Sequence, residues 1–124
     1  MELNEYQQKA LTTCMASCDN FAYMMLNLVG ELGELASKVA KQIRKENKGF
    51  EGNELVTTTR GDGMDHSEFE AGLRKEAGDI LWQLSGLCHV MDWDLEDVAQ
   101  ENLEKLAARK EAGTIDGDGD GIIR

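Results

Sequence analysis

The sequence predicts an all-α protein with a single domain, in which four helices form a bundle that a second subunit completes. Three observations support this prediction. A chain of 124 residues is large enough for one hydrophobic core. It contains no proline, and its apolar residues recur at spacings of three and four. Adjacent apolar residues such as Met24 and Met25 also place apolar surface on more than one side of a helix. We therefore expect a homo-oligomer, either a dimer or a tetramer.

The apolar periodicity predicts a first helix over residues 4–18 and a second, longer helix over residues 20–48. Residues 49–65 lose this periodicity and carry four glycines and a run of three threonines. They predict a flexible loop with a brief extended segment. A loop of this length in a small domain is typical of a lid or a flap that contacts substrate.

A third helix is predicted over residues 67–90, because Ser67 and Glu70 have the spacing of a capping box. After a tight connection, Asp94 is expected to cap a fourth helix. Because the connection is so short, we expect these two helices to be antiparallel neighbours.

These elements make residues 1–113 one helical domain and leave residues 114–124 as a tail rich in glycine and aspartate. The tail is either a solvated end or a flap over a neighbouring subunit's site. The net charge of −11 argues against binding to a nucleic-acid backbone. No apolar run has the length of a membrane span, and the three cysteines do not make an even disulfide framework. We expect a cytoplasmic protein with no nucleic-acid or membrane partner.

A short acidic phrase occurs twice, as ELGEL over residues 31–35 and as EAGDI over residues 76–80. In each copy two carboxylates stand three residues apart, so on a helix they project from one face. Each copy also holds a glycine, which costs about 1 kcal/mol relative to alanine in a helix and indicates close helix approach or space for a ligand. Converging carboxylates repel one another unless a cation lies among them. The phrases therefore predict a Mg²⁺ or Mn²⁺ site between two antiparallel helices, with the ligands Glu31, Glu34, Glu76 and Asp79.

Two other metal centres fit the sequence less well. A zinc site built from the three cysteines and His89 would not have a common zinc-ligand spacing. A di-iron bundle would carry Glu-x-x-His pairs, whereas the matching pairs here end in Ser37 and Asp79. A further interpretation is that the carboxylates form ordinary surface ion pairs, but glycine has no role in such a row.

Basic residues follow the first acidic phrase along the same flank of the second helix, namely Lys38, Lys41 and Lys45, with Arg44 close by. This strip spans about 10 Å at a rise of ~1.5 Å per residue, which suits a polyphosphate tail bound to metal. On the third helix, Gln83 lies one turn beyond the second acidic phrase. The predicted fourth helix carries Asn102, Lys105 and Arg109 on one face, a pattern that is also typical of surface ion pairs.

Taken together, these segments resemble the MazG-like, all-α nucleoside triphosphate pyrophosphohydrolases. LVGELGELASKV is similar to the family's E-x-x-E helix, KEAGDILWQLSGL to its E-x-x-D helix, and NLEKLAARK to its N-x-x-K-L-x-x-R segment. The resemblance covers roughly residues 2–113, and GTIDGDGDGIIR is similar to the ending of short members, many of them viral or bacterial. Gly30 stands here in place of the first glutamate of the longer E-E-x-x-E form, so no role of that carboxylate carries over.

The resemblance implies metal-dependent hydrolysis of a (deoxy)nucleoside triphosphate to the monophosphate and pyrophosphate, by water attack at the α-phosphorus. It implies that the four carboxylates are catalytic ligands of about two or three Mg²⁺ or Mn²⁺ ions, with Glu31 a candidate to accept the water's proton. Candidate phosphate or sugar contacts are Lys38, Lys41, Arg44, Asn102, Lys105 and Arg109. Candidates for base recognition are Asn20, Tyr23, Asn27 and Trp82.

Two alternatives remain open at this point. The chain could be a non-catalytic helical module that binds nucleotide or metal. The base also does not follow from the sequence, although room beside the loop at residues 49–65 favours a purine such as (d)GTP. A viral member would act on the nucleotide pool in the cytoplasm of its host.

Overall fold

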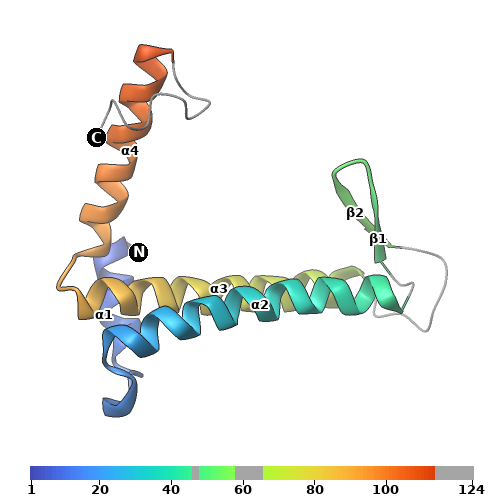
Figure 1. The fold of residues 1–124 in the computed structure, drawn as a ribbon, viewed down its shortest axis with the longest axis horizontal. Helices are drawn as coiled ribbons and strands as arrows, with labels where there is room; N and C mark the ends of the chain where they lie inside the picture. The colour runs from blue at the N-terminus through green and yellow to red at the C-terminus, as the bar shows by residue number, and fades with distance from the viewer. Residues whose placement is uncertain (46–47, 58–65, 114–124) are drawn as a thin grey trace.

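A pair of long antiparallel helices forms the centre of the molecule (Figure 1). The computed structural model describes residues 1–45, 48–57 and 66–113. In chain order the elements are α1 (Leu3–Leu11), a 3₁₀ turn η1 (Ala16–Cys18), α2 (Phe21–Arg44), β1 (Lys48–Glu51), β2 (Glu54–Thr57), α3 (His66–Val90) and α4 (Leu95–Ala112). The all-α class and the four helices are therefore confirmed, with one small hairpin added. The predicted C-terminal tail lies outside the described residues.

The contact between α2 and α3 is the largest in the chain, and it is closest where Met24 meets Gly86. The Met24 side chain is completely buried. A Cβ atom at position 86 would lie 2.7 Å from Met24 Cε, which no real contact of this kind allows. Any larger residue at position 86 would therefore displace the Met24 side chain from the place it fills between the two helices. By contrast, a Cβ at Gly33 or Gly78, the glycines of the two acidic phrases, would meet no atom within 4 Å.

The first helix is shorter than predicted, because it ends at Leu11 rather than at residue 18. The Thr12 hydroxyl donates a 2.6 Å hydrogen bond to Lys9 O, and the Thr13 hydroxyl donates a 2.7 Å bond to Ala10 O. Threonine side chains that bond backbone carbonyls in this way offer the chain an alternative to the helical pattern. The chain then turns into η1 and enters α2 through Asn20, whose Oδ1 accepts a 2.8 Å bond from the Tyr23 amide.

The last helix does not run back along α3, so the prediction of antiparallel neighbours is wrong. Figure 1 shows α4 pointing away from the α2–α3 pair, and its packing is against α1. Gln7 of α1 explains this direction. Its Oε1 accepts a 2.9 Å hydrogen bond from the Leu95 amide, and its Nε2 donates a 3.0 Å bond to Trp93 O. Asp94 occupies the N-cap position, but it makes no side-chain capping bond, and Asn4 Oδ1 instead accepts from the Glu96 amide at 3.0 Å.

Part of the predicted 49–65 loop is a β-hairpin that follows α2 (Figure 1). Lys48 pairs with Thr57 and Glu51 pairs with Glu54, so two residues form the turn. Gly52 has a φ of 62°, a backbone conformation that glycine adopts without steric cost at the first turn position. Helix α2 accordingly ends at Arg44, four residues earlier than predicted. The rest of the predicted loop, residues 58–65, lies outside the described residues.

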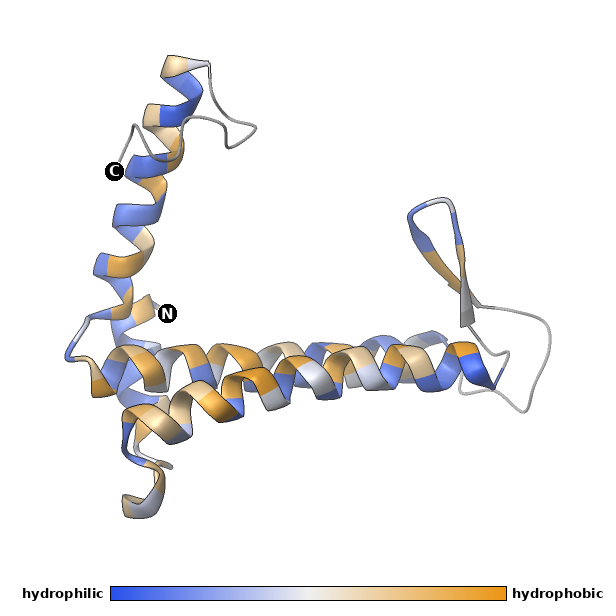
Figure 2. Ribbon diagram, in the orientation of Figure 1, coloured by the Kyte–Doolittle hydropathy of each residue, from blue (hydrophilic) through white to orange (hydrophobic). Residues whose placement is uncertain are grey.

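Much apolar surface stays uncovered in the single chain. Figure 2 shows apolar residues recurring along α2, and the large apolar side chains that are exposed there are Phe21, Met25, Leu26, Val29, Leu32 and Ile43. Within the described residues, the buried apolar side chains are only Met24, Phe69, Cys88 and Leu95. The described helices include none with the length and apolar character of a membrane span.

The close approach at Gly86 gives a first prediction. Replacing Gly86 with alanine forces a methyl group onto buried Met24 and should lower the free energy of unfolding by about 1–3 kcal/mol. Gly72→Ala is the matched control in the same helix, because its new methyl group meets no atom within 4 Å. The control should raise the free energy of unfolding by about 0.5–1 kcal/mol. Urea titration followed by circular dichroism measures both values, and equal effects of the two substitutions would refute the close approach.

Candidate metal centre

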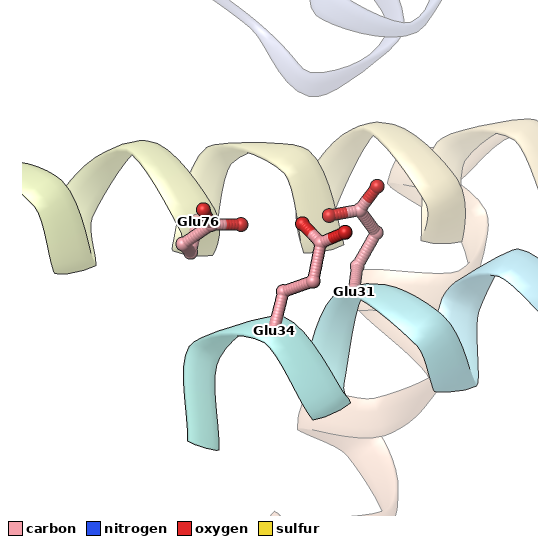
Figure 3. A group of neighbouring side chains, drawn as sticks. All are labelled: Glu31, Glu34 and Glu76. Carbon is pink, nitrogen blue, oxygen red and sulfur yellow. The ribbon is translucent and has the colours of Figure 1, made fainter. Parts of the chain in front are cut away.

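Three of the four predicted carboxylates meet between the two central helices. Glu31 and Glu34 are one turn apart on α2, and Glu76 reaches toward them from α3 (Figure 3). One oxygen from each of the three carboxylates lies within 4.8 Å of the others. The antiparallel α2–α3 packing therefore brings together residues that are far apart in the sequence, as the repeated phrase predicted.

The cluster concentrates negative charge in a partly buried place. Burial, followed by the charges of Glu34, Asp79 and Glu76, raises the pKa of Glu31. Glu31 Oε2 and Glu76 Oε2 are buried, and no hydrogen-bond donor among the described residues reaches either oxygen. Buried acceptors without partners are costly, and an all-oxygen donor set suits Mg²⁺ or Mn²⁺. The residues present therefore fit a divalent cation.

Asp79, the fourth predicted ligand, lies at the edge of the cluster. It lines a pocket together with Glu31, and its charge contributes to the raised pKa of that glutamate. The close group of three within 4.8 Å does not include it. Glu76 and Asp79 are one turn apart on α3, so the cluster extends along α3 in the direction of its C-terminus.

One side of the cluster is basic. Lys38 Nζ lies 3.5 Å from Glu76 Oε1, and the Glu76 residue is only 8% exposed. Lys38 and Lys41 line a pocket of about 340 Å³ together with Glu34, Glu76 and Ser37. Of the predicted strip, these two lysines are thus beside the carboxylates. Arg44 is in the last turn of α2 and does not line this pocket.

The opposite side of the cluster has no basic residue in its lining. A pocket of about 300 Å³ there is lined by Glu31 and Asp79 and by four uncharged side chains: Tyr23, Asn27, Trp82 and Gln83. Asn27 Nδ2 donates a 3.3 Å hydrogen bond to the Tyr23 hydroxyl. Asn20 does not line the pocket, and its amide caps α2 while Nδ2 donates a 3.1 Å bond to Ser17 O.

The predicted residues of α4 are not brought to the carboxylates within one chain. Asn102, Lys105 and Arg109 are on the helix that points away from the α2–α3 pair (Figure 1). The zinc alternative has no structural support among the described residues, because the candidate metal cluster there consists of glutamates alone. Cys88 is buried, whereas Cys14 and Cys18 are partly exposed, and all three are free thiols.

Gln83 is a residue of this site that the sequence did not identify, although it lies one turn beyond Asp79. Gln83 is only 4% exposed, and its Oε1 has no hydrogen-bond partner among the described residues. The signal available in the sequence was that this polar residue continues the helical spacing of the acidic phrase. Its burial was not visible in the sequence, because charged and amide residues at such positions are usually solvated.

Comparisons with known proteins agree with this geometry. Residues 20–114 match the family model described as the MazG nucleotide pyrophosphohydrolase domain. The chain is also 34% identical, over 127 aligned positions, to the "Gene 37 protein" of Mycobacterium phage L5, and the match covers 97% of this chain and 98% of that protein. No solved structure matches the chain significantly. The chain thus belongs to the MazG nucleotide pyrophosphohydrolase domain family.

Proposed function

We propose that the protein hydrolyses a (deoxy)nucleoside triphosphate to the monophosphate and pyrophosphate, by attack of water at the α-phosphorus. The observation that carries this proposal is the order of three regions along the α2–α3 pair. A pocket that contains Lys38 and Lys41, the carboxylate cluster, and a pocket whose other lining side chains are uncharged follow one another. A nucleoside triphosphate has a matching order of anionic tail, metal-binding phosphates and nucleoside. Membership of a nucleotide pyrophosphohydrolase family supports the same assignment.

The cofactor in this proposal is Mg²⁺, with Mn²⁺ as a substitute, and about two or three ions are present with substrate. Their ligands are Glu31, Glu34, Glu76 and Asp79. Divalent cations at such a site neutralise phosphate charge and lower the pKa of bound water. Glu31, which has a raised pKa, is suited to accept the water's proton.

Lys38 and Lys41 bind the departing β- and γ-phosphates in this arrangement, because both line the pocket on the basic side of the carboxylates. Arg44 extends the positive strip to the end of α2. Tyr23, Asn27 and Trp82 line the pocket on the other side and hold the nucleoside. The metal ligands between them then face the α-phosphate. Asn20 is not part of this proposed site, because its side-chain amide caps α2.

A homo-oligomer is part of the proposal. Each side chain of the exposed apolar stripe on α2 would contribute about 1.5–3 kcal/mol of free energy on full burial. A second copy of the chain that packs on this stripe would bury it. Helix α4 projects beyond its own chain and carries Asn102, Lys105 and Arg109. In a dimer or tetramer this helix can supply those residues to the partner's site. The phage source of the relative supports action on the nucleotide pool of a bacterial host.

Product analysis is the direct test of the proposed reaction. Incubation with each common ribo- and deoxyribonucleoside triphosphate and Mg²⁺ should yield monophosphate and pyrophosphate, resolved by ion-exchange chromatography. EDTA should abolish turnover and added Mn²⁺ should restore it, since the proposed ligands are all carboxylates. Inorganic phosphate with nucleoside diphosphate as products would overturn the attack at the α-phosphorus. Binding of triphosphate without any turnover would identify a non-catalytic module instead.

Removing one carboxylate should separate its role in metal binding from its effect on stability. Because the pKa of Glu31 is raised, folding favours its protonated form. The contribution of Glu31 to the stability of the metal-free protein is therefore fully present below the ordinary carboxyl pKa, and it is lost as pH rises through the raised pKa. Glu31→Gln should raise the melting temperature of the metal-free protein at neutral pH, yet lower kcat/KM by ~100-fold or more.

The control for this experiment is Glu101→Gln, an exposed position on α4. It should change neither the melting temperature nor kcat/KM. Glu34→Gln and Asp79→Asn should lose activity to a similar extent while keeping the helical circular dichroism. Near-normal rates in these variants would mean that the acidic phrases are structural, and a melting temperature of Glu31→Gln below that of the wild type would contradict the repulsion.

Light scattering coupled to size-exclusion chromatography tests the assembly. The wild type should have a mass of two or four chains, and Leu26→Glu should reduce it, because the charge enters the exposed apolar stripe. Gln8→Glu adds the same charge to an exposed position on α1 and should leave the mass unchanged. A wild-type mass of one chain at all concentrations would refute the proposed oligomer.

A further inference from the structure

The pocket on the uncharged side of the carboxylates has a specific hydrogen-bonding character. Its volume is about 300 Å³, and its lining combines two aromatic side chains, two amides and two carboxylates: Tyr23, Trp82, Asn27, Gln83, Glu31 and Asp79. Which donors and acceptors remain available in this lining decides what the pocket can recognise.

The donors of the two aromatic side chains are already engaged. Trp82 Nε1 donates to Ala10 O at 3.0 Å and to Thr13 Oγ1 at 3.1 Å, which fixes the indole ring against α1. The Tyr23 hydroxyl donates a hydrogen bond to Cys18, and this bond raises the pKa of Tyr23. The rings therefore present faces and edges to a ligand, while their polar hydrogens are used within the protein.

Gln83 lines this pocket, and its acceptor oxygen Oε1 has no hydrogen-bond partner among the described residues. Its amide makes a hydrogen bond to Tyr23 that lowers the pKa of that phenol, as a donated bond does. The amide group is thereby oriented with its NH₂ toward Tyr23, which also accepts from Asn27 Nδ2 at 3.3 Å. Gln83 Oε1 is buried, and no donor among the described residues reaches it. The residue is 4% exposed, so water does not readily satisfy this oxygen.

We propose that Gln83 is a specificity-determining residue, whose Oε1 accepts a hydrogen bond from the nucleoside of the substrate. The inference rests on the proposed function only for the identity of the ligand as a nucleotide. The neighbouring carboxylates Glu31 and Asp79 add negative potential, so the pocket favours a ligand group that donates. An exocyclic amino group of the base and a sugar hydroxyl are the nucleoside groups with this chemistry.

The physical basis of the selectivity is the unpaired oxygen. A donor that reaches Gln83 Oε1 gives a buried acceptor its first partner, whereas an analogue that lacks the donor leaves it unpaired. Sites built around such a hydrogen bond reject the analogue much more strongly than sites that recognise shape alone. The rigid indole of Trp82 holds the ligand at a fixed distance from the amide.

Binding of nucleoside monophosphates, measured by isothermal titration calorimetry with Mg²⁺ present, tests this inference without relying on turnover. The wild type should bind a ligand with the recognised donor about 10-fold more tightly than its matched analogue. The amino group is tested by dCMP against dUMP, by dAMP against dIMP and by dGMP against dIMP. The sugar hydroxyls are tested by a ribonucleoside monophosphate against its 2′-deoxy form, and by the 2′-deoxy form against its 2′,3′-dideoxy form.

Gln83→Met keeps the size of the side chain and removes the acceptor. It should weaken binding of the donor-bearing ligand about 10-fold and leave both members of the pair with equal affinity. The affinity for pyrophosphate, which occupies the other side of the carboxylates, should not change. Gln8→Met makes the same substitution at an exposed position of α1 and should bind every ligand as the wild type does.

The outcomes separate this inference from the proposed function. Discrimination between matched ligands that persists in Gln83→Met would overturn the role of Gln83. Equal binding of all pairs by the wild type would overturn it as well, and this comparison needs no variant if Gln83→Met fails to fold. Selective binding without hydrolysis would leave the nucleoside site standing and refute the proposed reaction alone.

Discussion

Met24 fills the interface between α2 and α3, the two acid-bearing helices, because Gly86 has no side chain at that point. Full burial of a methionine contributes about 1.5–3 kcal/mol. Two carboxylates about 5 Å apart repel by roughly 3 kcal/mol at an effective dielectric constant of about 20. The packing therefore offsets about one such repulsion, whereas the cluster contains three carboxylates. The Lys38 ammonium beside Glu76 relieves part of the remainder, and protonation of Glu31 or a bound cation relieves more.

Helical periodicity was sufficient to predict α2, α3 and α4, because each has a long apolar stripe that repeats with the helical turn. It was not sufficient at either end of the chain. The first helix ends early because Thr12 and Thr13 bond its carbonyls, a local competition that apolar spacing does not register. The direction of α4 depends on Gln7 bonding the Leu95 amide. A glutamine that caps a helix 88 residues away leaves no pattern in the sequence.

The candidate site was predictable to the extent that its residues repeat with helical spacing. The two acidic phrases predicted the convergence of Glu31, Glu34 and Glu76, because the antiparallel pairing of two helices is the simplest way to bring them together. The sequence left two interpretations of the glycines within the phrases, close helix approach or open space, and the structure shows open space at Gly33 and Gly78. Gln83 could not be assigned, because the value of a polar residue in a site depends on burial and on unsatisfied hydrogen bonds.

The bonds made by Gln7 also have a consequence for the order of folding. They join the first helix to Ser85, Trp93 and Leu95, at sequence separations of 78, 86 and 88 residues. Contacts between residues so far apart in the sequence require most of the chain to close into a loop. Because this closure costs conformational entropy, such contacts form later than contacts between residues that are near in the sequence. On a ribosome, the N-terminal helix leaves the exit tunnel first, but it completes its contacts only after α3 and the start of α4 have been synthesised. The segment made earliest is thus among the last to reach its final position.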